Sequence, residues 1–127
     1  MKLIPVLLLC LLSVRACTIS SKGFLVGANC FQSEERNINP GDINLPADQD
    51  VDLRIRACYP RANKTRTFMV VLSSGEIFSL DAAGNALSAK LVAAAGKPGK
   101  GQPRFAVDIT GSTWHETIHV DSISAAR

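Results

Sequence analysis

The second half of the chain carries five strand-like segments and one Ala-rich segment, and their order limits the folds open to it. Residues 51–57 place apolar side chains at every second position, which is the pattern of a strand buried on one face. Residues 86–95 have apolar side chains at helical spacing and precede a glycine, which predicts a helix that ends there. The remaining segments are rich in β-branched and aromatic residues, and they cover residues 67–72, 76–80, 105–110 and 117–123. Three strands, one helix and two strands predict a mainly β fold, either a five-stranded OB-like barrel or a curled antiparallel sheet.

Turns and loops are expected between these elements. Ser73-Ser74-Gly75 predicts a tight hairpin turn, and Gly111-Ser112-Thr113 predicts another between the last two strands. Residues 32–50 are polar, contain two prolines and follow neither hydrophobic period, which predicts a long loop. Before this loop, residues 24–26 form at most a short strand. We therefore expect an N-terminal tether and loop over residues 17–50 and the β domain over residues 51–127.

The first sixteen residues have the order of an export signal. A basic residue precedes an apolar run over residues 3–12, and Val14 and Ala16 then place modest side chains where a signal peptidase requires them. The run has about 10 residues, half of the roughly 20 that a membrane-spanning helix needs. We expect residues 1–16 to be removed, rather than retained as an anchor, and the remainder to be exported.

Removal of this signal leaves three cysteines, Cys17, Cys30 and Cys58, which is an odd number for an oxidising compartment. The stretch Val14-Arg15-Ala16-Cys17 resembles a bacterial lipobox, in which the cysteine thiol takes a diacylglycerol, although Arg15 departs from the usual small or aliphatic residue. Acylation of Cys17, as the resemblance implies, would leave Cys30 and Cys58 to form a disulfide, with two buried thiols as the alternative. The disulfide would close a loop of roughly 29 residues and stabilise the fold by about 3 to 4 kcal/mol. The expected location is the periplasm or outer membrane for a lipoprotein, or outside the cell for a protein secreted without lipid.

The local clustering of basic residues indicates a binding surface, although the net charge of the chain does not. Without the signal, 12 basic residues face 11 acidic ones, so net charge does not favour a nucleic-acid partner. Five basic residues nevertheless fall between positions 54 and 66, and guanidinium groups suit phosphate or carboxylate ligands. This predicts a surface for a small anionic ligand or a protein, and a solvated sheet face is the alternative. The candidate binding residues are Arg54, Arg56, Tyr59, Arg61, Lys64 and Arg66.

His115-Glu116-Thr117-Ile118-His119 matches the His-Glu-x-x-His motif of zinc proteases. On a helix this spacing brings both imidazoles to one metal, with the glutamate beside the bound water. The neighbouring residues favour a strand, on which His115 and His119 would lie roughly 13 Å apart at about 3.3 Å per residue. We therefore expect a strand here, and keep a zinc-dependent hydrolase that uses His115, Glu116 and His119 as the alternative function.

The hairpin sequence over residues 74–85 leads to Val107-Asp108-Ile109-Thr110-Gly111 and then to the closing segment over residues 118–123. This series resembles a family of small exported bacterial OB-like domains without assigned function. The resemblance covers roughly residues 51–123 and carries no catalytic residue or cofactor to this chain. We accordingly expect a non-enzymatic binding domain, attached to a membrane surface through a lipid on Cys17 if that residue is acylated.

Overall fold

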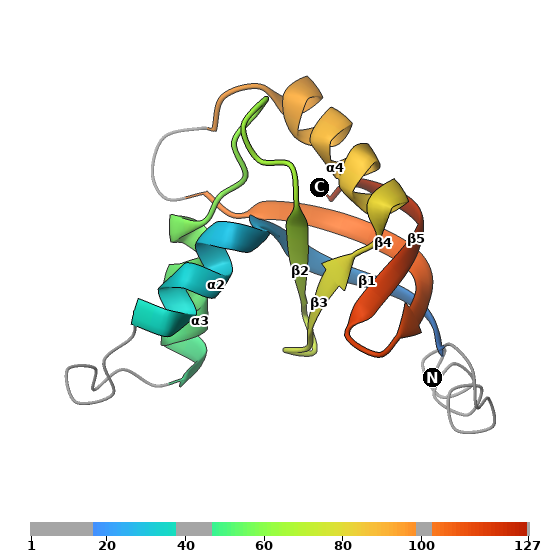
Figure 1. The fold of residues 1–127 in the computed structure, drawn as a ribbon, viewed down its shortest axis with the longest axis horizontal. Coiled ribbons are helices and arrows are strands. Elements are labelled where there is room, and N and C mark those ends of the chain that lie inside the picture. The colour runs from blue at the N-terminus through green and yellow to red at the C-terminus, as the bar shows by residue number, and fades with distance from the viewer. Residues whose placement is uncertain (1–16, 38–46, 99–102, 127) are drawn as a thin grey trace.

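Five strands of the protein close into a barrel, and a pair of helices packs on its outer side (Figure 1). The computed structural model describes residues 17–37, 47–98 and 103–126. The elements in chain order are β1 (Cys17–Gly27), α2 (Ala28–Asn37), α3 (Ala47–Ala57), β2 (Phe68–Leu72), β3 (Ile77–Leu80), α4 (Ala82–Ala95), β4 (Phe105–Trp114) and β5 (Thr117–Ala125). The order around the barrel is β1-β2-β3-β5-β4, and β1 closes it against β4. The predicted five-stranded OB-like barrel with a helix between its third and fourth strands is confirmed.

The first strand of the barrel comes from the segment that the sequence assigned to a tether. β1 pairs with β4 over residues 17–25 and with β2 over residues 23–27, so residues 23–25 pair with both neighbours. A Cβ atom at Gly23 would lie 2.8 Å from the carbonyl oxygen of Val71, so the close approach of β2 requires glycine there. The expected short strand at residues 24–26 is thus one part of an 11-residue strand.

Residues 51–57 form the second half of α3, so the expectation of a strand there is wrong. Val51, Ile55 and Cys58 lie four and three residues apart and share one helical face, although Val51 and Ile55 also belong to the alternating pattern that suggested a strand. Leu53, which the strand pattern placed among the buried positions, is 45% exposed. The apolar residues of this segment thus allow either a strand or a helix, and packing against β1 and β2 favours the helix.

The expectation of a continuous loop over residues 32–50 is also wrong where the structure describes that segment. α2 continues to Asn37, and α3 begins at Ala47. Residues 38–46 lie outside the described residues. Within residues 17–37, 47–98 and 103–126, no helix has the length and apolar content to span a bilayer.

Two buried clusters hold the molecule together. The larger cluster fills the barrel and includes Leu25, Val70 and Ile118, each with no exposed surface. The smaller cluster lies between the helical pair and the outer side of β1 and β2. Its buried members are Val26, Phe31, Ile55, Cys58 and Val71. Cys30 is bonded to Cys58, with a Cα–Cα distance of 5.5 Å, which confirms the expected disulfide and links α2 to the end of α3.

α4 packs against β5 and β3 through a face of small side chains. Gly84, Ser88 and Val92 are buried at four-residue intervals along the helix. Asp81 caps the helix, because its Oδ1 accepts a hydrogen bond from the Gly84 amide at 2.8 Å. The helix begins four residues earlier than the sequence predicted and ends at Ala95 as expected.

The turn between the last two strands lies further along the chain than the sequence predicted. β4 continues through Gly111 to Trp114, and β5 begins at Thr117. Gly111 lies at an irregularity in the β4–β5 pairing, where an added Cβ would lie 2.2 Å from the His119 carbonyl oxygen. The glycine is therefore needed for close backbone approach, and the turn forms at His115 and Glu116.

Candidate functional site

Two adjoining pockets lie where β1, α3, β2 and α4 come together. Their volumes are about 440 and 610 Å³, within the range of roughly 300 to 1,000 Å³ that is usual for small-molecule sites. Both pockets are lined by Ala57, Tyr59, Arg61 and Lys64, and we call the two together the basic groove. Residues 27–30, Cys58 and residues 65–67 complete the first pocket, and Pro60, Ala62 and residues 96–98 complete the second.

Backbone hydrogen bonds fix the frame of the basic groove. The Gly27 amide donates to the Cys58 carbonyl at 3.0 Å, and the Ala28 amide donates to the Thr67 carbonyl at 2.9 Å. These bonds join the end of β1 to the end of α3 and to the start of β2. The Cys30–Cys58 disulfide lines the first pocket beside the same junction. The wall on this side is therefore tied both by hydrogen bonds and by a covalent link.

A compact turn carries two of the basic side chains. The Thr65 amide donates to the Arg61 carbonyl at 3.0 Å, and the Arg61 amide donates to the Thr65 hydroxyl at 2.8 Å. Asn63 has a φ of 65°, in the left-handed region that asparagine tolerates better than most residues. The turn thus defines the backbone positions of Arg61 and Lys64, while their side chains stay exposed.

Tyr59 gives the basic groove an aromatic surface. Its ring contacts that of Phe105 edge to face, with centroids 5.6 Å apart, and this contact anchors the side chain on the barrel. Burial raises the pKa of the Tyr59 phenol, so the hydroxyl stays neutral at physiological pH. The tyrosine therefore offers a hydrogen-bonding group and a flat apolar face without adding negative charge.

The charge of the basic groove has one sign. Arg61, Lys64 and Arg66 come from the segment before β2, and Lys97 comes from the end of α4, more than thirty residues later. None of the lining residues is acidic. In the described part of the chain, no carboxylate forms an ion pair with these four side chains. An anion that enters the groove would meet unneutralised positive charge.

The structure brings together four of the six binding residues predicted from sequence. Tyr59, Arg61, Lys64 and Arg66 line the basic groove, whereas Arg54 and Arg56 do not. Lys97 was not among the predicted binding residues, because its place in the groove depends on how the end of α4 meets the turn before β2. Only the glycine that ends the helix could have indicated that the chain changes direction there.

Arg54 and Arg56 lie on α3 and form contacts away from the groove. The Arg54 guanidinium carbon lies 4.0 Å from the centre of the Phe31 ring, and its Nη2 donates to the Phe31 carbonyl at 3.2 Å. Arg56 forms an ion pair with Asp52, which also accepts a hydrogen bond from Arg104 Nε at 2.5 Å. The bond from Arg104 is the main reason that the pKa of Asp52 is lowered. Arg54 therefore joins α3 to α2, the Asp52–Arg104 pair joins α3 to the start of β4, and neither Arg54 nor Arg56 lines the groove.

The His-Glu-x-x-His segment forms the tip of the β4–β5 hairpin. His115 lies in the turn with a φ of 58°, and its ring contacts the Trp114 ring with centroids 5.1 Å apart. His119 lies in β5, where its Nδ1 is 3.6 Å from Asp81 Oδ2. The helical turn that would bring both imidazoles to one metal is not formed there. Among the residues that the structure describes, no group of three or more His, Cys, Asp or Glu side chains could hold a metal ion.

Cys17, the predicted lipidation position, is the first residue of β1 and lies opposite Thr113 in the pairing with β4. It is therefore next to the β4–β5 hairpin and at the opposite end of β1 from the basic groove. Comparison with known proteins gives no function for the β4–β5 hairpin or for the basic groove. No family model, no curated protein and no solved structure matches this chain.

Proposed function

We propose that the protein is an exported, non-enzymatic binding domain that takes a small anionic ligand in the basic groove. The observation that carries the proposal is the convergence of Arg61, Lys64, Arg66 and Lys97 on a hollow whose lining has no acidic residue. Charged side chains that stabilise a fold usually pair with a side chain of opposite charge, as Asp52 does with Arg104. Four like charges around a hollow are better explained by an anion that binds there.

The other lining residues narrow the class of ligand. Tyr59, Pro60 and Pro98 offer apolar surface beside the charges, which suits an anion with a carbon body. Guanidinium groups bind both phosphate and carboxylate through paired hydrogen bonds. The proposed ligand is therefore a small organic phosphate or carboxylate.

Export rests on the N-terminal sequence and is supported by the disulfide. Bonds such as Cys30–Cys58 persist in oxidising compartments and are rare in the reducing cytosol. We propose that Cys17 becomes the N-terminus and carries a lipid. Expression in a bacterial host should then give an N-terminal fragment that begins at Cys17 with the added mass of the lipid. An unmodified thiol on that fragment would exclude the lipid but not export.

Ligand binding can be tested by titration of the purified protein with inorganic phosphate, a sugar phosphate and a small dicarboxylate. Calorimetry should detect at least one of them, and the organic anions should bind more tightly than phosphate. Lys64→Glu should weaken this binding about 10-fold or more, since a charge-assisted hydrogen bond of about 1.5 to 3 kcal/mol is replaced by repulsion.

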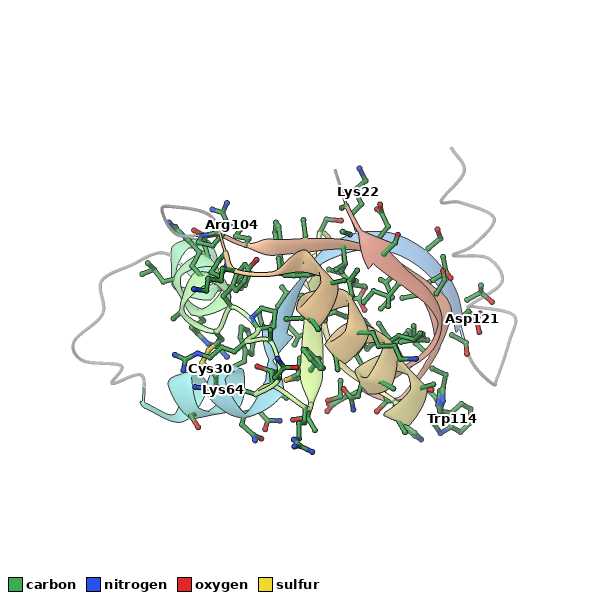
Figure 2. The ribbon with its side chains drawn as sticks, turned by 90° about the horizontal axis from the view of Figure 1, so that it is seen from above. Lys22, Cys30, Lys64, Arg104, Trp114 and Asp121 are labelled. Carbon is green, nitrogen blue, oxygen red and sulfur yellow. A yellow bond between two sulfur atoms is a disulfide. The ribbon has the colours of Figure 1, made fainter. Side chains whose placement is uncertain are left out.

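The matched control is Lys22→Glu, which changes net charge by the same amount. Lys22 is exposed on β1 and lies away from Lys64 (Figure 2). Its replacement should leave the affinity nearly unchanged. Equal losses in the two variants would mean that binding follows net charge alone, and absence of binding by all three probes would refute the proposed ligand class.

A further inference from the structure

An exposed tryptophan marks the end of the molecule opposite the basic groove. Trp114 is the single tryptophan of the chain and is 45% exposed at the end of β4. Figure 2 shows Trp114 at one end of the molecule and Lys64 and Cys30 at the other. We call residues 17–19, 81–84 and 111–121 the hairpin end, because they comprise the β4–β5 turn and the elements that begin beside it.

The backbone holds Trp114 at a defined position. It lies opposite Thr117 in the β4–β5 pairing, and the preceding Thr113 lies opposite both Ile118 and Cys17. The side chain therefore projects from the end of a three-stranded part of the barrel and contacts the His115 ring. An exposed aromatic residue on such a rigid support loses little conformational freedom when it contacts a partner.

The chain before β1 indicates what the partner is. Four residues separate the apolar run at residues 3–12 from Cys17, so the end of the run lies at most roughly 18 Å from Cys17 along the chain. If this run is retained, it would attach the protein to a bilayer just before β1. If it is removed and Cys17 carries a lipid, the attachment would again be at the start of β1. In both cases the attachment point lies next to Thr113, one residue from Trp114.

The charges of the hairpin end indicate how the contact is made. Its described residues include Asp81, Glu116 and Asp121 and contain no lysine or arginine. The described residues of this end therefore offer no attraction to anionic headgroups. Tryptophan, in contrast, prefers the boundary between headgroups and acyl chains, where its ring is buried and its N–H stays hydrated.

We propose that the hairpin end rests on the bilayer, with Trp114 inserted at the headgroup boundary and the basic groove directed away from the membrane. The occupant of this surface is a lipid bilayer of neutral or mixed headgroups, not a second protein. The inference rests on the attachment proposed at Cys17 and not on the basic groove, so failure of the ligand titrations would leave it unaffected.

The single tryptophan makes a direct test possible. The full chain, produced in a bacterial host and reconstituted into phosphatidylcholine vesicles, should show blue-shifted tryptophan emission. A nitroxide placed near the lipid headgroups should quench most of this emission, whereas one near the end of the acyl chains should quench it weakly. Quenching should be the same at low and high salt, because the contact is not ionic.

The control moves the tryptophan to another exposed position. Leu53 is also 45% exposed, on α3, which lies across the molecule from the hairpin (Figure 1). In the double variant Trp114→Phe with Leu53→Trp, the vesicle-bound protein should show little quenching by either nitroxide. Disulfide content and circular dichroism would establish that this variant is folded.

Three outcomes would overturn the proposal. Failure of the chain to associate with vesicles would exclude a bilayer as the occupant. Association without quenching of Trp114 would mean that the hairpin end is free in the attached protein and open to a protein partner instead. Equal quenching of the tryptophans at positions 114 and 53 would indicate adsorption without a preferred orientation.

Discussion

The barrel and the helical pair are stabilised in different ways, although the same strands contribute to both. In the barrel, each strand pairs with two neighbours and directs alternate side chains inward, so the interior is supported from many sides. The helical pair is joined to β1 and β2 by a smaller cluster and is fixed at one point by the Cys30–Cys58 disulfide. Loss of one contact should therefore be shared across the barrel but should loosen the helical pair locally. Because the basic groove borders that pair, the less supported region forms part of the binding surface.

The largest expected effect is a cavity inside the barrel. Ile118 is fully buried, pairs with Thr113 of β4 and Leu80 of β3, and belongs to the main cluster. Ile118→Ala should lower the free energy of unfolding by about 4 kcal/mol, in the upper part of the range for such truncations. Urea unfolding followed by circular dichroism would measure it, with Leu53→Ala as an exposed control expected to change stability little. A loss below about 1 kcal/mol would mean that the barrel interior adapts to the missing side chain.

Removal of the disulfide tests the helical pair directly. The double variant Cys30→Ala with Cys58→Ala should lower the free energy of unfolding by about 3 to 4 kcal/mol, because the unfolded chain is no longer constrained. Hydrogen exchange should show that amides of α2 and α3 lose more protection than those of β4 and β5. Equal loss of protection in the barrel and the helices would contradict the distinction between the two regions.

Asp81 links α4 to the barrel, and its removal should have an intermediate effect. Its Oδ1 accepts hydrogen bonds from the amide of Gly84 in the helix and, at 3.3 Å, from the amide of Val120 in β5. Asp81→Ala removes the cap and leaves both amides without this acceptor, which should cost about 1 to 2 kcal/mol. Thermal unfolding would show the loss, while Asp121→Ala, an exposed position on β5, should change stability by less than about 0.5 kcal/mol.

The smallest expected effect concerns the Asp52–Arg104 ion pair, which joins α3 to the start of β4. Arg104 lowers the pKa of Asp52 below its ordinary value of 3.8, so the folded state favours the charged carboxylate. The corresponding stability is present above that ordinary value and is lost as the pH falls through the lowered pKa. Both side chains are partly exposed, so the contribution should be below about 1 kcal/mol. Asp52→Asn should lose it at pH 7, and the difference from the parent protein should vanish in strong acid.

Four of the five barrel strands and α4 were predictable from sequence because their signals are local, whereas most of β1 was assigned to a tether. The turn at residues 73–75, the alternation along residues 105–110 and the glycine after Ala95 each determine the conformation of their own neighbourhood. The helical pair was missed for a physical reason. The apolar side chains of residues 51–57 alternate as in a strand, while Val51, Ile55 and Cys58 share a helical face. Contacts with Phe31 and Val71, which are distant in the chain, favour the helix.

The candidate site was predictable only in part for the same reason. Tyr59, Arg61, Lys64 and Arg66 are neighbours in the sequence, so their clustering is visible without a structure. Lys97 and Cys30 join them through tertiary contacts alone. Gly111 was predicted to lie in a turn but lies within β4. A glycine that permits close approach of two strands looks the same in the sequence as one that forms a turn.

The length of β1 sets a distance between the two ends of the protein. Its 11 residues run from the hairpin end to the edge of the basic groove, a path of roughly 30 Å at about 3.3 Å per residue. Electrostatic fields in physiological salt decay over about 8 Å, so such a path covers several screening lengths. A ligand in the basic groove would therefore be selected by the groove itself, with little influence from the charge of a membrane at the other end.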